Sequence, residues 1–235
     1  PPPPSVPSEP GTLEERQEAT KRAVRDPFAL ASQCRVDPAF DWTAEATQAD
    51  FKSQQSQDKF LLSVLLPPDR KTHGTFVEFG AGDGVFHSNT FFLEKHLCWR
   101  GICIEPSKTV FDDLVKNRPD CIAVHGAICD QEGPREFVEV TSADGGWTGW
   151  SGFRDDFPDE HWRQINEKVA QENWHIDTEM VPCRKLDALL REHGMARVNY
   201  MSVDVEGAEL EVLRYVQDFF LSESRGEGRG GRSGG

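Results

Sequence analysis

Basic residues are outnumbered by acidic ones, and long apolar runs are missing, in this 235-residue sequence. Lys and Arg total 26 against 40 Asp and Glu, which leaves a net charge of −14. Nucleic-acid backbones and anionic membranes bind basic surfaces, so neither is expected as the main partner, and solubility explains the charge more simply. No apolar run approaches the roughly 20 residues of a membrane helix, so we expect no membrane segment within this chain.

Closely spaced cysteines of the metal-binding type are also missing. None of the six cysteines forms a Cys-x-x-Cys motif, so a structural zinc site is not expected. Cys103 and Cys121 fall in predicted strands, which indicates buried reduced thiols rather than a disulfide framework. The lack of an Asn-x-Ser/Thr sequon slightly favours the cytoplasm. An upstream signal or anchor remains an alternative, because the chain begins at Pro1 without Met.

Composition divides the chain into four segments. Residues 1–11 are Pro-rich and residues 222–235 carry no apolar side chain, so both are expected to be disordered. Residues 12–52 are predicted to be a helical and irregular extension, with a helix over Thr12–Arg25. Residues 53–221 are expected to form the folded domain.

Strand and helix patterns alternate early in this domain. Apolar runs at Phe76–Phe79, Gly101–Ile104 and Cys121–Val124 are typical of buried strands, and the third can extend to Ile128. Two helices are predicted between them, the first capped by Ser88 or Asn89 and ending at Leu97, and the second starting at Pro106. This order predicts an α/β fold, with a parallel sheet that carries helices on both faces.

The remainder of the domain adds elements of both kinds. Two extended runs are predicted to pair as antiparallel strands, and a final strand joins the parallel sheet. Apolar positions on one face indicate the helices. The added strands are Arg135–Val140 and Thr178–Val181, the final strand is Val198–Val203, and the helices are Asp58–Leu66, Asp159–Glu172, Lys185–His193 and Glu206–Phe220.

A turn with three glycines follows the first strand. Its glycines, Gly80, Gly82 and Gly84, let the backbone approach a ligand closely. The spacing differs from the GxGxxG of dinucleotide folds, and Asp83 would repel a pyrophosphate. The turn, with Ala81, instead suits the cationic amino-acid end of S-adenosylmethionine, and a purely structural turn is the alternative.

Acids at the strand ends complete the predicted site. Glu78 can accept a hydrogen bond from the ligand's ammonium, or it can be a solvated acid at the end of the strand. Glu105 can accept both ribose hydroxyls, with a charge at the helix N-terminus as the alternative. Beyond the third strand, the backbone of Ala127 and Ile128 and the carboxylate of Asp130 can contact an adenine, or form an ordinary turn.

A second acidic cluster follows the last parallel strand. Asp204 is a candidate general base that deprotonates or orients a substrate hydroxyl, or a metal ligand, although no His adjoins it. Glu206 is a second catalytic candidate, with helix capping as its alternative. The loop Trp147–Trp150 can stack on a sugar face, or pack locally.

Five motifs in order resemble the FkbM-type methyltransferase family, over about residues 53–213. The resemblance extends to a eukaryote-rich branch that also contains Star-like proteins. It implies a Rossmann-like, S-adenosylmethionine-dependent O-methyltransferase acting on a hydroxyl of a small molecule or glycan. It also suggests that Gln57 and Asp58 border the cofactor site. The motifs are QDKFLL at Gln57–Leu62, FVEFGAGDGVFHSNTFFLE, GICIEP, CRKLDALL and YMSVDVEGAELEVL.

The sequence departs from this family after the fourth parallel strand. A methyltransferase sheet needs further strands there, whereas low-complexity sequence follows, so we expect three C-terminal strands to be missing. Truncation, an incomplete gene model and completion by a partner chain are the alternatives. A non-catalytic interaction or trafficking module, as in the Star-like relatives, is the second functional hypothesis. A nicotinamide dehydrogenase is disfavoured by Asp83.

Overall fold

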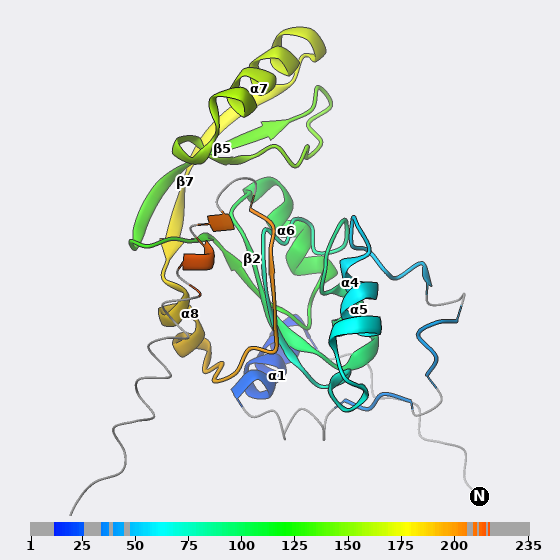
Figure 1. The fold of residues 1–235 in the computed structure, drawn as a ribbon. Coiled ribbons are helices and arrows are strands. Elements are labelled where there is room, and N and C mark those ends of the chain that lie inside the picture. The colour runs from blue at the N-terminus through cyan, green and yellow to red at the C-terminus, as the bar shows by residue number, and fades with distance from the viewer. Residues whose placement is uncertain are drawn as a thin grey trace, which may run out of the picture.

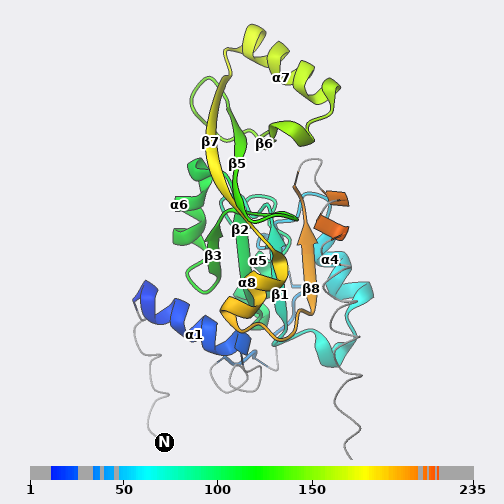
Figure 2. The same cartoon turned by 90° about the vertical axis from the view of Figure 1, so that its left-hand side faces the viewer.

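Two sheets and the helices around them form the described part of the chain. The computed structural model describes residues 12–25, 34–37, 40–44, 48–205, 209–210, 212–214 and 216. The expectations for residues 1–11 and 222–235, for most of the helix Glu206–Phe220 and for missing C-terminal strands concern residues outside these ranges. Figures 1 and 2 show a parallel sheet flanked by helices, with a mixed sheet and helix α7 (Asp159–Glu172) at its upper end.

The parallel sheet has the strand order β3-β2-β1-β8. Strand β1 (Thr75–Phe79) lies between β2 (Arg100–Glu105) and β8 (Tyr200–Val203), and β3 (Ile122–His125) pairs with β2. All of these pairs are parallel, as predicted. The chain proceeds from β1 outward to β3 and later places β8 on the other side of β1. The border between β1 and β8 is therefore a topological switch point, where ligands bind in open α/β sheets.

Helices cover both faces of this sheet, as predicted. Along β1, Phe76 packs with α5 (Phe91–Leu97) and α6 (Lys108–Asn117), whereas Val77 packs with α8 (Leu186–His193). Successive strand residues point to opposite faces, so a run of apolar residues serves two cores at once.

The N-terminal helices differ in one respect from the prediction. The helix predicted at Asp58–Leu66 forms as α4 (Gln57–Phe60) and continues as a π-helical turn, η1 (Leu61–Leu65). Helix α1 (Leu13–Arg25) forms as predicted and packs near β2 and β3. Two short 3-10 turns also form, η2 (Pro68–Arg70) and η3 (Arg154–Asp156).

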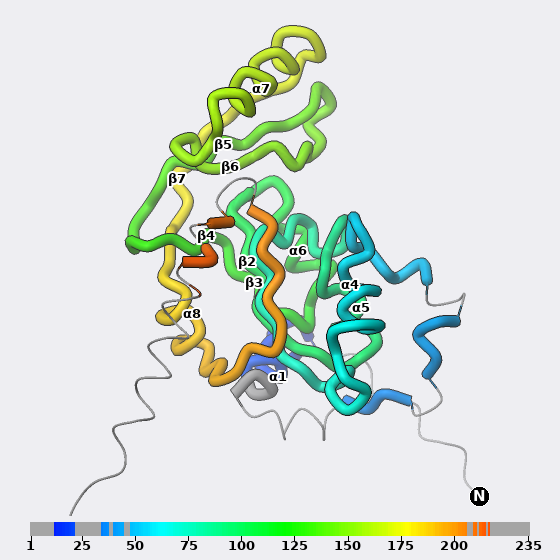
Figure 3. The backbone as a smooth tube through the Cα atoms, in the orientation of Figure 1, coloured from blue at the N-terminus to red at the C-terminus, as the bar shows by residue number. Residues whose placement is uncertain are grey.

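The third strand ends earlier than its longest predicted extent. Gly126 takes a φ of 151°, and a Cβ there would lie 2.7 Å from the carbonyl oxygen of Pro182. The chain turns at this glycine, and β4 (Ala127–Ile128) pairs in parallel with β7 (His175–Arg184) in the second sheet. Figure 3 traces this change of sheet. An extension of β3 to Ile128 is therefore wrong.

The mixed sheet has the order β4-β7-β5-β6. Strand β5 (Gly133–Thr141) pairs with β7 along its whole length, which confirms the predicted antiparallel addition. The short β6 (Gly152–Phe153) pairs with β5. Helix α7 packs on this sheet through Ile165, and together they form a lobe at the carboxyl end of the parallel strands (Figure 1).

Two disulfides contradict the expectation of reduced thiols. Cys34 is bonded to Cys98 and Cys129 to Cys183, over sequence separations of 64 and 54 residues. The fold brings these pairs together, since Cys129 directly follows β4 and Cys183 lies in its partner β7. Disulfides are typical of oxidising compartments rather than of the cytoplasm. The other two cysteines, Cys103 and Cys121, are free and buried, as predicted.

Candidate functional site

A cavity of about 450 Å³ lies between the parallel sheet and the lobe. The carboxyl ends of β1, β2 and β8 and the strand β4 form one side of it. The loop between β5 and β6 and the strand β6 itself form the other side, where every residue from Trp147 to Phe153 lines the cavity. Small-molecule sites have volumes of roughly 300–1,000 Å³, so one ligand of cofactor size fits here.

Gly80 allows two strand ends to meet at this cavity. Its φ is 70°, and a Cβ on Gly80 would lie 1.8 Å from the carbonyl oxygen of Asp204. The backbone N–H groups of Gly80 and Ala81 donate to the carbonyl of Ile104 at 3.0 and 3.1 Å. The backbone of the turn is thereby fixed between β2 and β8, and both Gly80 and Ala81 line the cavity.

The next two residues of the turn do not line the cavity. The N–H of Gly82 donates to the carboxylate of Glu105 at 2.7 Å. The carboxylate of Asp83 accepts from the N–H groups of Val85 and Phe86 at 2.8 and 2.7 Å. Asp83 therefore stabilises the turn locally, and a direct contact with a ligand in this cavity is not supported by its position.

Glu105 lines the cavity and is only 4% exposed. One carboxylate oxygen accepts from Gly82 and the other from the N–H of Ser107 at 2.7 Å. Burial raises the pKa of Glu105 to about 7, these two hydrogen bonds oppose the shift, and the nearby charge of Glu139 adds to it. A carboxylate has about four acceptor sites, so two donors from a ligand can still be bound.

The raised pKa of Glu105 makes stability depend on pH. The folded state keeps a proton that the unfolded chain releases above its ordinary pKa of 4.5, so the free energy of unfolding should fall as pH rises from 4.5 to about 7. The full loss is roughly 3 kcal/mol. Urea denaturation at pH 5 and pH 8 measures most of this loss, and Glu105→Gln should lack this part of the pH dependence. Equal pH dependence in both proteins would contradict the assignment.

Glu78 is buried rather than solvated, and it anchors the loop that follows the glycine turn. Its carboxylate accepts from the hydroxyl of Ser88 at 3.0 Å, the N–H of Asn89 at 2.7 Å and the hydroxyl of Thr90 at 2.6 Å. Ser88 in turn accepts from the N–H of Phe91, but the residue at the N-cap of α5 is Thr90, so the prediction that Ser88 or Asn89 is the cap is wrong by one or two residues. Glu78 also lines the cavity, but most of its acceptor sites are already used.

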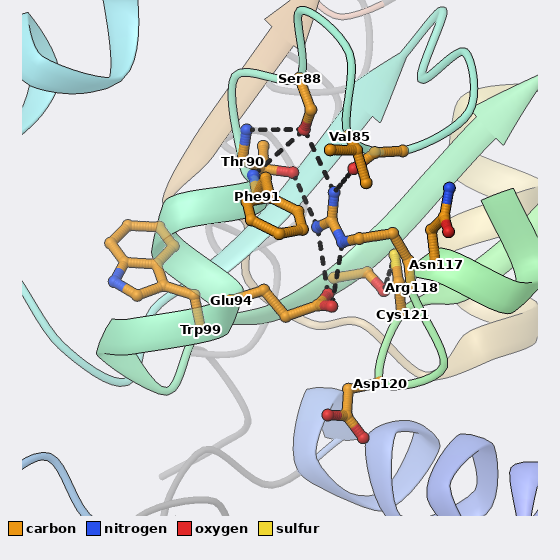
Figure 4. A network of polar contacts seen from close by, with 12 residues as sticks. Val85, Ser88, Thr90, Phe91, Glu94, Trp99, Asn117, Arg118, Asp120 and Cys121 are labelled. Atoms are coloured by element: carbon orange, nitrogen blue, oxygen red, sulfur yellow. Dashed lines mark hydrogen bonds and ion pairs between the residues drawn. The ribbon is translucent and has the colours of Figure 1, made fainter. Parts of the chain in front are cut away.

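Arg118 completes this network from the far end of α6 (Figure 4). Its guanidinium pairs with Glu94 at 2.9 Å and donates to the carbonyl of Gly84 at 3.0 Å. It also donates to the hydroxyls of Ser88 and Thr90 at 3.1 and 3.0 Å. One buried cation therefore holds both ends of the loop that borders the cavity. A single Arg before a proline gives no sequence signal for this role.

The two residues predicted from the resemblance lie beside the cavity lining rather than in it. Asp58 is buried, and its carboxylate accepts from the N–H groups of Lys52 and Ser53 at 3.0 and 3.2 Å. Gln57 accepts from the N–H of Gln55. Gln54, in the same segment, does line the cavity, so contact of Gln57 or Asp58 with a cofactor stays a prediction.

Of the three residues predicted to contact an adenine, only two line the cavity. Ala127 and Ile128 line the cavity, whereas Asp130 is exposed and lies outside the lining. Strand β4 is fixed there by its pairing with β7 and by the disulfide of Cys129. Glu206 lies outside the described residues.

Asp204 lines the cavity beside Gly80. The side chain of Asp204 is exposed, yet desolvation by the protein around it raises its pKa, the charge of Glu209 adds to this shift, and His87 opposes it. His87 lines the cavity too, at a φ of 60° that is uncommon outside glycine. Among the described residues, no group of three or more His, Cys, Asp or Glu side chains is placed to hold a metal ion.

Aromatic side chains line the side of the cavity that the lobe forms. Trp147 meets Phe86 edge to face, with ring centroids 6.2 Å apart. Trp150 stacks on His161 at 5.4 Å. The position of Trp147–Trp150 over the glycine turn could not be predicted from the sequence, because the lobe arises from strands distant in the chain.

A family comparison agrees with this arrangement. The sequence model described as the methyltransferase FkbM domain matches residues 78–230, which is more than half of the chain. The chain belongs to the FkbM methyltransferase family. No curated protein and no solved structure matches it. Membership of this family, together with the α/β fold, identifies a methyltransferase domain, whose cavity lies at the switch point of the sheet. In the described residues, no helix is long and apolar enough to cross a membrane.

Proposed function

We propose that this FkbM domain is an S-adenosylmethionine-dependent O-methyltransferase, with a small molecule or a glycan hydroxyl as acceptor. The observation that carries the proposal is the cavity at the switch point, where Glu105 is held by two N–H groups with acceptor sites left over. A buried carboxylate at this strand end suits two ribose hydroxyls. The adenine would lie against Ala127 and Ile128, and the amino-acid end near Gly80 and Ala81.

The residues of the chain would position the reactants and receive a proton. When bound, S-adenosylmethionine supplies a methyl group activated by its sulfonium. Asp204, which lines the cavity and whose pKa is raised, can accept the proton of the acceptor hydroxyl. The aromatic wall at Trp147 and Trp150 offers apolar contact to the acceptor and limits access of water.

Calorimetry with S-adenosylhomocysteine tests the cofactor part. We expect binding to the wild type and a loss of about 100-fold in Glu105→Ala, because two hydrogen bonds to a charged group are lost. The 2′-deoxy analogue should be weakened in the wild type but much less in Glu105→Ala, since both changes remove the same contact. Glu132→Ala, which removes an exposed acid, is the matched control.

Formation of S-adenosylhomocysteine with hydroxylated acceptors tests the catalytic part. Absence of cofactor binding by the folded wild type would refute the proposal. Binding without transfer to any hydroxyl would favour a non-catalytic module instead.

A further inference from the structure

One buried acceptor in the cavity lining has no donor. Asn89, in the loop before α5, is 7% exposed and lines the cavity. In the described part of the chain, its side-chain oxygen Oδ1 is covered by neighbouring atoms and has no hydrogen-bond partner. The other such oxygen belongs to Asp156, which does not line the cavity. A buried acceptor without a donor is unfavourable, so native proteins rarely keep one without a reason.

The remainder of Asn89 is held in place. Its backbone N–H donates to Glu78 at 2.7 Å, and its side-chain nitrogen donates to the hydroxyl of Ser202 in β8 at 2.8 Å. The neighbouring hydroxyls of Ser88 and Thr90 donate to Glu78, so they are not free to donate to Asn89. A donor for Oδ1 must therefore come from a ligand. The last torsion of an asparagine side chain is soft, so a small rotation of the amide presents Oδ1 to the cavity.

Asn89 lies at the border between β1 and β8, the switch point of the sheet. Glu78 and Ser202, which hold it, are paired residues of these two strands. The proposed adenine wall lies in β4, which follows β3 on the other side of β1. The part of the cofactor placed beside the glycine turn is its amino-acid end. This end is therefore the part of the cofactor that lies nearest to Asn89.

We propose that Asn89 binds the ammonium of the cofactor's amino-acid end through Oδ1. The inference rests on the proposed function. An ammonium brings three donors, and Glu78, the acid that the sequence predicts for this role, already accepts from two hydroxyls and a backbone N–H. The amide oxygen of Asn89 is an acceptor without such a partner. Asn89 thereby distinguishes the cofactor from adenosine compounds that lack the amino group.

Calorimetry with three ligands and three proteins tests this contact. The ligands are S-adenosylhomocysteine, its analogue without the amino group and its analogue without the carboxylate. The proteins are the wild type, Asn89→Ala and the matched control Asn166→Ala. Asn166 is an exposed asparagine of α7 outside the cavity lining, and its side chain also donates one hydrogen bond, to the carbonyl of Trp162 at 2.7 Å. Circular dichroism confirms that each variant is folded.

S-adenosylhomocysteine should bind Asn89→Ala about 10- to 100-fold more weakly than the wild type, because a hydrogen bond to a charged group is lost. The analogue without the amino group should bind these two proteins with affinities within about twofold, since it lacks the same contact. The analogue without the carboxylate should show the full loss in Asn89→Ala. Asn166→Ala should behave like the wild type with every ligand.

Equal weakening of S-adenosylhomocysteine and its analogue without the amino group in Asn89→Ala would overturn the inference and leave the proposed function standing. The same holds if removal of the carboxylate, rather than of the amino group, abolishes the effect of Asn89→Ala. If Asn89→Ala does not fold, Asn89→Ser, which keeps a hydroxyl at this position, takes its place with the same expectations. Failure of S-adenosylhomocysteine to bind the folded wild type would instead refute the proposed function.

Discussion

Replacing Arg118 by methionine should lower the free energy of unfolding by about 3–5 kcal/mol. The Arg118 side chain is 1% exposed and its partners Glu94 and Glu78 are 8% and 3% exposed, so loss of the guanidinium leaves two buried carboxylates without a cation. Ser88 and Thr90, which hold Glu78, lose a donor at the same time. Urea denaturation followed by far-UV circular dichroism measures the change.

Two further variants separate the ion pair from simple loss of packing. Arg118→Met combined with Glu94→Leu should recover part of the lost stability, because no unpaired charge then remains at this pair. Arg163→Met on the exposed face of α7 also removes an arginine that pairs with two acids, yet it should cost less than about 1 kcal/mol. A loss in Arg118→Met no larger than that in Arg163→Met would contradict a structural role for this network.

The parts of the fold that sequence analysis predicted are those with a local signal. Strands β1 and β2 are apolar runs that end at a glycine turn and at Pro106, so their type and direction follow from neighbouring residues. Carboxyl ends of parallel strands meet at one edge of a sheet, so the sequence predicts Glu105 and Asp204 at the same edge, and both line the cavity there.

The remainder depends on contacts between distant segments. The Cys129–Cys183 disulfide requires that β4 leave the parallel sheet at Gly126, which no periodicity indicates. Arg118 acquires its role only when α6 is packed behind the glycine turn. The Trp147–Trp150 loop reaches the cavity because β5 and β7 carry it there. Asp83 and Asp130 were predicted to border the cofactor, but neither lines the cavity, because a local pattern does not determine which way a turn side chain points.

Gly80→Ala should abolish cofactor binding and cost at least about 3 kcal/mol of stability. A φ of 70° costs a residue with a Cβ about 1–2 kcal/mol. The larger effect is steric, since the new Cβ would lie 1.8 Å from the carbonyl oxygen of Asp204, a backbone atom that cannot rotate away. The ends of β1 and β8 must then separate, which moves Asp204 relative to Glu105 across the cavity. Calorimetry with S-adenosylhomocysteine and urea denaturation measure the two effects.

Gly145→Ala isolates the conformational part of this effect. Gly145 has a φ of 82°, close to that of Gly80, and no atom lies within 4 Å of a Cβ built on it. It should therefore lose only about 1–2 kcal/mol of stability and keep its affinity for S-adenosylhomocysteine. If Gly80→Ala behaved like Gly145→Ala in both measurements, the strand ends would not be in the close contact that forms this site.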